Sequence, residues 1–249
     1  MKKPSGYIIY EGPSLLDGKP IVAIAIVKSK NTKTANMVQT YILRADLDPR
    51  EANRTGEDYS ICGNCPHRGV SFAALLTGLA KDRTCYVRID QGPTIVYKSM
   101  LRGIYPVAAG HKAIAAIGEG RMVRIGTYGD GAAVPSYVWD SLLDQAKGHT
   151  AYTHQSGAMA SSYDASRYMV SADSERAARA AWNTGARTFR VIWDTSDLVK
   201  NREVLCPASA EAGYRTTCDK CGLCGGASVR AKSIAIVAHG SGAGNLATL

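Results

Sequence analysis

Short apolar runs separated by polar segments fill the first 44 residues. They lie at 7–10, 20–27 and 37–43, are rich in Ile, Val and Tyr, and are broken by polar stretches such as 28–36. Runs of about four to eight residues with β-branched and aromatic side chains are typical of strands. The pattern predicts a β-rich part, which we place at 1–120.

Strand-like and helix-like patterns alternate after residue 120. An apolar run at 121–127 precedes a helix that begins near Pro135, and another strand follows the helix. The segment 167–194 repeats this order, with Asp173 or Ser174 as the cap of an alanine-rich helix. Two further strands are expected, at 203–206 and 233–239. Repeated strand–helix–strand units indicate parallel strands, and so an α/β fold that is barrel-like or an open parallel sheet.

Length and composition narrow the class of protein. The 249 residues suffice for one substantial core, so we expect a single α/β domain over 1–249 with cysteine-bearing metal loops. Hydrophobic residues at 45% and charged residues at 20% exclude a disordered or fibrous chain. The longest apolar run, at 21–27, is too short to cross a bilayer, and we expect a soluble protein of the cytosol.

Polar residues follow several of the predicted strands. In α/β folds, ligands bind where the carboxyl ends of parallel strands meet. We therefore take Asp130, His154, Asp173 and His239 as candidate catalytic residues. Each also has a structural explanation, because Asp173 can cap a helix and either histidine can be a hydrogen-bonded structural residue.

The net charge of +9 lies mostly in the N-terminal half. Residues 1–125 carry 18 Lys and Arg against 10 Asp and Glu, a net of +8. A basic surface favours an anionic partner, most often nucleic acid. A surface that serves only solubility would have the same composition.

The segment 204–226 carries the strongest chemical signal. We call Cys206, Cys218, Cys221 and Cys224 the C-terminal cysteine set. In a reducing compartment clustered cysteines more often hold metal than form disulfides, and seven cysteines cannot all pair internally. The tight spacing and the proline after Cys206 favour an iron–sulfur cluster, while a single zinc with four thiolates would use the same residues.

A second group of candidate ligands lies earlier in the chain. We call Cys62, Cys65 and Cys85 the N-terminal cysteine set; with His67 they could form a Cys3His zinc site. Alternatively, Cys85 is a small buried hydrophobic residue within a strand, and His67 a surface residue. The two sets could also contribute ligands to one site.

Five segments carry a resemblance to a known family. They are GYIIYEGPSLLDGKPIVAIAIV, SICGNCPHRG, RIGTYGDGAAVP, HTAYTHQ and CPASAEAGYRTTCDKCGLC. Over nearly the whole chain, the sequence resembles a family of uncharacterised small cysteine-rich proteins encoded by bacteriophages and plasmids. The resemblance implies that the seven cysteines are functional and that the protein is an accessory of a mobile element in a bacterial host. It implies no reaction, and its YGD and YTH motifs favour Asp130 and His154.

Two functions follow as hypotheses. The first is a cysteine-ligated metalloprotein, holding an iron–sulfur cluster or zinc, that acts as an enzyme on nucleic acid or nucleotides. The second is a zinc-stabilised protein that binds nucleic acid without catalysis.

Overall fold

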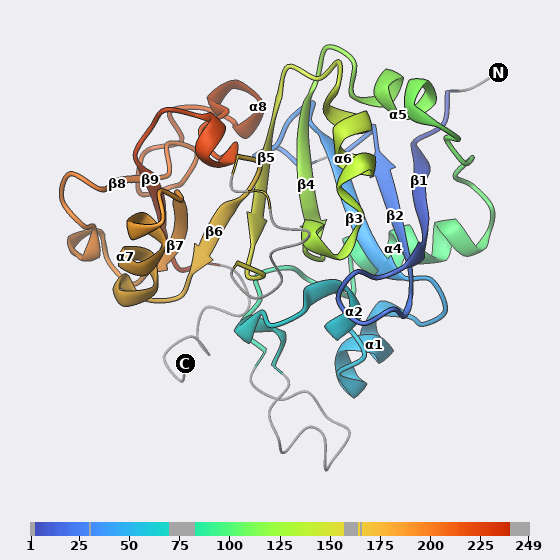
Figure 1. Ribbon diagram of the computed structural model, residues 1–249, viewed down its shortest axis with the longest axis horizontal. Helices are drawn as coiled ribbons and strands as arrows, with labels where there is room; N and C mark the ends of the chain where they lie inside the picture. Colours follow the sequence, from blue (N-terminus) through green and yellow to red (C-terminus); the bar gives the residue numbers. More distant parts are fainter. Residues whose placement is uncertain (1–2, 30, 70–82, 157–163, 165, 240–249) are drawn as a thin grey trace.

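The computed structural model describes residues 3–29, 31–69, 83–156, 164 and 166–239. In these residues nine strands form one sheet in the order β1-β2-β3-β4-β5-β6-β7-β9-β8 (Figure 1). The strands are β1 (Gly6–Pro13), β2 (Pro20–Ile26), β3 (Val38–Arg44), β4 (Met122–Tyr128), β5 (Gly148–Thr153), β6 (Met169–Ala172), β7 (Thr188–Ile192), β8 (Glu203–Leu205) and β9 (Ser233–Val237). The sheet is open in the part of the chain described, because β1 and β8 form its two edges.

Short helices connect and flank the strands. The α-helices are α1 (Pro49–Thr55), α2 (Tyr59–Cys62), α4 (Gly92–Leu101), α5 (His111–Gly118), α6 (Ser136–Leu143), α7 (Glu175–Asn183) and α8 (Cys218–Cys221). Single 3-10 turns are η1 (Pro66–Arg68), η2 (Gly131–Ala133), η3 (Thr195–Asp197) and η4 (Gly226–Ser228). None of the helices in the described residues is long and apolar enough to span a membrane.

The expected α/β class and its parallel sheet are confirmed. β1, β2 and β3 are antiparallel to one another, and from β3 onward all neighbouring strands are parallel. β2 is apolar along its whole length after Pro20 and is buried on both faces, as a central strand must be. β9 lies between β7 and β8, so the chain forms the edge strand β8 before it forms β9.

The β-rich part ends earlier than predicted. The described residues of 49–118, which are 49–69 and 83–118, contain the α-helices α1, α2, α4 and α5 between β3 and β4. Two of these helices begin at a proline in the first turn, Pro49 and Pro93, where the missing N–H costs nothing. Cys85 lies in a loop, so the alternative that placed it inside a strand is wrong.

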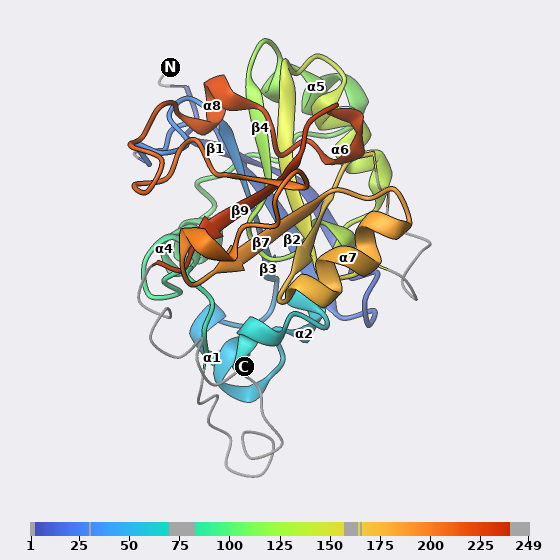
Figure 2. The same cartoon turned by 90° about the vertical axis from the view of Figure 1, so that its left-hand side faces the viewer.

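The two faces of the parallel sheet have different roles. Side chains alternate between faces along a strand, and on one face Val123 and Ile125 of β4 join a core with Trp139 and Leu142 of α6. The opposite face lines a cavity. In both views α8 lies beyond one end of the strands and α1 and α2 lie beyond the other (Figures 1 and 2).

Candidate metal centre

A cavity of about 580 Å³ lies against the inner face of the sheet. This volume is within the range of pockets that bind small molecules. Most of the strand residues that line it alternate along their strands, as the pleat requires. They are Tyr41 of β3, Arg124, Gly126 and Tyr128 of β4, Thr150 and Tyr152 of β5, Ser171 of β6, Phe189 and Val191 of β7, and Ile234 and Ile236 of β9, and the neighbouring Thr127 and Ala172 line it as well. Residues of 58–68, 83–93 and 206–224 complete the wall.

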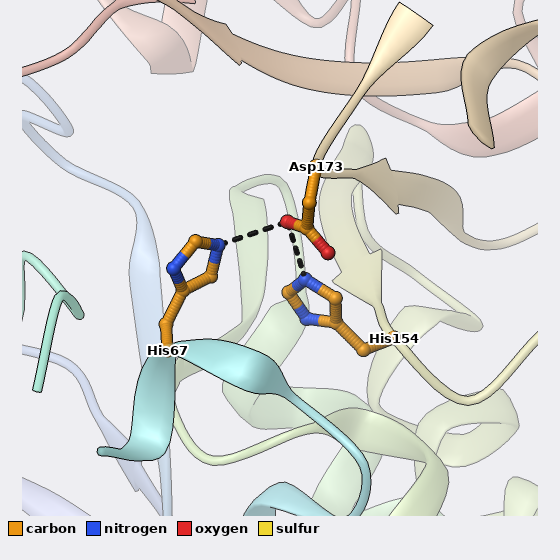
Figure 3. Close-up of side chains that lie close together, drawn as sticks. All are labelled: His67, His154 and Asp173. Carbon is orange, nitrogen blue, oxygen red and sulfur yellow. Dashed lines mark hydrogen bonds and ion pairs between the residues drawn. The ribbon is translucent and has the colours of Figure 1, made fainter. Parts of the chain in front are cut away.

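Three of the lining side chains point toward one another (Figure 3). His67 lies on η1, His154 follows β5, and Asp173 follows β6. His67 Nε2 is 2.9 Å from Asp173 Oδ1, and His154 Nε2 is 3.2 Å from the same oxygen. The ligand atoms of the three residues all lie within 4.8 Å of one another, close enough to hold one metal ion.

Asp173 is available for this contact because its neighbour caps the helix. Ser174 is the N-cap of α7, and its Oγ accepts a hydrogen bond from Ala177 N at 3.1 Å. The alternative in which Asp173 caps the helix is therefore wrong. Asp173 directly follows β6 and lines the cavity. Among the described residues, its carboxylate forms hydrogen bonds with His67 and His154.

Hydrogen bonds and an ion pair fix the loop that carries His67 to neighbouring segments. His67 Nδ1 lies 2.7 Å from the buried Thr84 hydroxyl, which orients the ring. The next residue, Arg68, forms a buried ion pair with Asp58 at 2.7 Å. Gln155 donates from Nε2 to the Cys62 carbonyl at 3.0 Å, which joins the same loop to the end of β5. These bonds hold His67 toward a histidine from a distant part of the chain.

Among His67, His154 and Asp173, which we call the triad, the pKa values of Asp173 and His154 are shifted by their neighbours. Burial raises the pKa of Asp173, but hydrogen bonds from His154 and His67 outweigh this and hold the pKa well below its usual range. Burial lowers the pKa of His154, but hydrogen bonds to Asp173 and Cys65 bring it well above its usual value. The site thus favours positive charge beside the carboxylate, and a cation can take the place of the imidazole proton.

Asp130 lines the same cavity but is engaged in the fold. Its Oδ1 accepts from Ala132 N at 3.0 Å. Its Oδ2 accepts from Thr153 Oγ1 and His154 N, both at 2.9 Å, and from Gln155 Nε2 at 3.3 Å. Four hydrogen bonds leave this buried carboxylate little capacity for chemistry, and its role is to position the backbone of His154.

His239, the fourth catalytic candidate, lies at the rim of the cavity. Its ring is exposed, its Nδ1 lies 2.9 Å from the Val237 carbonyl, and its centroid is 6.3 Å from that of Tyr86. It does not belong to the group of ligand atoms formed by His67, His154 and Asp173. The four candidates thus face one cavity, and two of them meet directly.

The N-terminal cysteine set surrounds the triad loosely. Cys62, Cys65 and Cys85 all line the cavity, and burial, with smaller effects of the neighbouring thiols, raises the pKa values of Cys62 and Cys85. Cys65 hydrogen bonds to His154. No three cysteine sulfurs among the described residues lie within 4.8 Å of one another. The Cys3His site therefore stays a prediction, and His67 instead faces Asp173.

The C-terminal cysteine set includes the two ends of α8, which lies beyond one end of the strands (Figure 1). Its four members line the cavity, and none of the seven cysteines, all of which are described, forms a disulfide. Cys206 and Cys224 are buried in a small apolar cluster with Met169, Ile234 and Ile236, against which Cys218 packs. Both sets face one cavity, but no three of their sulfurs form a site for a single ion in the described structure.

Comparisons with known proteins add no family. No family model, no curated protein and no solved structure matches this chain. The function has to be inferred from the residues of the cavity themselves.

Proposed function

We propose that this protein is a metal-dependent enzyme of the bacterial cytoplasm that acts on a nucleotide or on the end of a nucleic-acid chain. In this proposal His67, His154 and Asp173 hold a divalent metal ion at the wall of the cavity. The observation that carries it is the convergence of these three ligand atoms on an open cavity of about 580 Å³.

The spacing of each histidine nitrogen from Asp173 suits a single ion. Two ligand atoms about 2.1 Å from one ion, at angles of about 90–110°, lie roughly 3.0–3.4 Å apart. The two nitrogen–oxygen distances at Asp173 are 2.9 and 3.2 Å. Two histidines and one carboxylate are a known ligand set for catalytic zinc and for non-haem iron.

The number of ligands favours an enzyme over a structural metal site. Structural zinc is usually closed by four protein ligands, whereas catalytic metals keep a position open for water or substrate. Here three ligands meet beside a cavity, so an ion held by them has room for a phosphate oxygen or a water molecule. A metal in that position polarises the phosphate and lowers the pKa of bound water.

The lining of the cavity supports an anionic aromatic substrate. Five cations line it, Lys33, Arg68, Arg83, Arg88 and Arg124, of which Arg68 and Arg88 are already paired with Asp58 and Asp90; the carboxylates of the lining are Asp58, Asp130 and Asp173. Five aromatic side chains line it as well: Tyr41, Tyr86, Tyr128, Tyr152 and Phe189. Cations suit phosphates, and aromatic faces suit stacked bases.

The alternative is a protein that binds nucleic acid by its basic N-terminal half, with metal serving only structure. Several arginines of that half already contact carboxylates: Arg44, Arg50, Arg54, Arg68 and Arg88. Ion-paired arginines attract phosphate less strongly than free ones. The cavity also contains Lys33 and Arg124, which form no ion pair among the described residues, so it is the better supported anion site.

The test separates this metal from any metal bound by cysteine. Mn²⁺ prefers oxygen and nitrogen ligands over thiolates, so its binding, followed by the electron paramagnetic resonance of the free ion, reports on the triad. We expect one Mn²⁺ per chain, and an affinity at least about tenfold lower in His154→Ala and Asp173→Asn, because even the loss of groups that support a ligand has such effects. The matched control is Ser174→Ala, which removes the cap of α7 next to Asp173 and should bind Mn²⁺ normally. Equal Mn²⁺ affinity in all four proteins would refute the centre.

Turnover is then measured with nucleoside triphosphates and short oligonucleotides in the presence of Mn²⁺ or Zn²⁺. We expect hydrolysis by the wild type and Ser174→Ala and none by His154→Ala. Binding of these anions without turnover of any of them would favour the non-catalytic alternative.

A further inference from the structure

We infer that the C-terminal cysteine set holds an iron–sulfur cluster whose negative charge is balanced by Arg124. This would be a second metal centre on the cavity, beyond the proposed function. The cluster would be ligated by Cys206, Cys218, Cys221 and Cys224.

The loop that carries the set is fixed to the sheet at several points. Cys206 continues β8 and donates its N–H to the Ala235 carbonyl at 2.8 Å. The N–H of Cys218 donates to the Lys33 carbonyl at 2.9 Å, and the Cys224 carbonyl accepts from Ala151 N at 3.1 Å. Two of these bonds reach strands, β9 and β5, and the third reaches the turn before β3, while all four cysteines line the cavity.

Glycines give this loop its tight course. Gly222, at the end of α8, has φ +63°, a left-handed conformation that glycine adopts without strain. At Gly226, with φ +65°, a Cβ atom would lie 2.5 Å from the Ser166 carbonyl oxygen. Only glycine fits there, so the backbone after Cys224 presses closely against the chain before β6.

Arg124 supplies a positive charge with no carboxylate partner among the described residues. It lies on the cavity face of β4, where Nη2 donates to the Tyr86 hydroxyl at 2.6 Å and the guanidinium lies 5.5 Å from the Tyr152 ring centroid. Its Nε is inaccessible to solvent and has no hydrogen-bond partner in the described structure. A desolvated cation without a counter-charge is costly. Its charge acts on Cys218 and Cys224, and their thiolates would supply the missing negative charge.

The separation of the sulfurs favours a cluster over one zinc ion. Thiolates at about 2.3 Å from a tetrahedral zinc lie roughly 3.8 Å apart. No three cysteine sulfurs in the described residues come within 4.8 Å of one another. In a cluster the thiolates bind different iron atoms, so they lie farther apart than around a single ion.

The experiment is anaerobic reconstitution of the full chain with ferrous and ferric iron and sulfide, followed by iron and sulfide analysis and visible absorption. We expect wild type to bind a cluster and Cys221→Ser and Cys224→Ser to lose it. Cys62→Ser and Cys85→Ser, from the N-terminal set, are the matched controls and should retain it. A colourless protein with tightly bound zinc would overturn the inference, as would loss of the cluster only in the N-terminal variants.

Arg124 gives a test that does not depend on removing a ligand. The Arg124→Met substitution removes this charge and should lower the reduction potential of the cluster, because positive charge near a cluster favours the reduced state. Arg121→Met is the matched control, since this guanidinium, three residues earlier in the chain, instead binds the carbonyls of Val27 and Asn36. Equal potentials in wild type and Arg124→Met would refute the role of Arg124. Mn²⁺ binding at the triad should persist in all cysteine variants, so the two proposals fail separately.

Discussion

The sharpest test of the catalytic candidates concerns Asp130, which the sequence favours as a catalytic residue and the structure makes a positioning residue. In Asp130→Ala, the N–H groups of Ala132 and His154 both lose their acceptor. The Thr153 hydroxyl also loses the acceptor of its proton, although its Oγ1 still accepts from Gln155 N at 2.9 Å. Three donors without their acceptor, at about 1–3 kcal/mol each, predict a loss of about 3–9 kcal/mol in the free energy of unfolding.

Asp130→Asn should be milder. Its amide oxygen can stay at the position of Oδ2, where three donors point, and its NH₂ then faces only Ala132 N. One lost hydrogen bond predicts about 1–3 kcal/mol. The matched control is Asp194→Ala, which removes an exposed carboxylate that caps η3 and should cost about 1 kcal/mol.

The assay is urea unfolding at neutral pH, with Mn²⁺ affinity measured on the same samples. We expect the order of stability wild type, then Asp130→Asn, then Asp130→Ala, with Mn²⁺ affinity in Asp130→Asn close to that of the wild type. If Asp130→Asn is as stable as the wild type but has lost all turnover, Asp130 takes part in the reaction and the positioning role is refuted.

Two further predictions concern the scaffold. Burial lowers the pKa of His149 below the unfolded value of about 6.5, although the hydrogen bond to the Arg167 carbonyl opposes this shift. Neutral His149 therefore stabilises the fold above that pH. This contribution to stability is lost as the pH falls through the folded pKa. His149→Gln should show a smaller fall in urea midpoint between about pH 7.5 and pH 5.5 than the wild type, and an identical fall would contradict this. Trp139 is fully buried, and its Nε1 donates to the Gly131 carbonyl at 2.9 Å. Trp139→Ala should therefore lower the free energy of unfolding, measured by urea titration, by about 3–5 kcal/mol. A loss below about 1 kcal/mol would contradict this and would mean that neighbouring side chains fill the space of the indole ring.

The parallel half of the fold could be predicted because each element there has its own local signal. β4, β6 and β7 are short apolar runs, and α7 has a serine cap and an alanine-rich body. The helices between β3 and β4 lack such signals. α4 and α5 bury only part of each turn and follow loops, so their apolar residues do not stand out from those of a strand.

The candidate site could be predicted in part. His154 and Asp173 were identifiable because polar residues at the carboxyl ends of parallel strands meet at one edge of the sheet. His67 was identifiable only as a neighbour of cysteines, since its partners lie 87 and 106 positions later in the chain and only the folded sheet brings them together. Arg124 has a weaker signal, a charged residue in the middle of a largely apolar strand.

One strand links the two proposed centres. On β5, Tyr152 hydrogen bonds to Cys224, and two residues later His154 contacts Asp173. Successive residues of a strand rise by about 3.3 Å, so the Cα atoms of Tyr152 and His154 are roughly 7 Å apart along the chain. A charge added at the triad would therefore act on the cysteine set across a desolvated cavity wall, where electrostatic effects are stronger than in water. Such coupling is reciprocal. If a metal at the triad tightens cluster binding by the cysteine set, then a bound cluster tightens metal binding at the triad by the same factor.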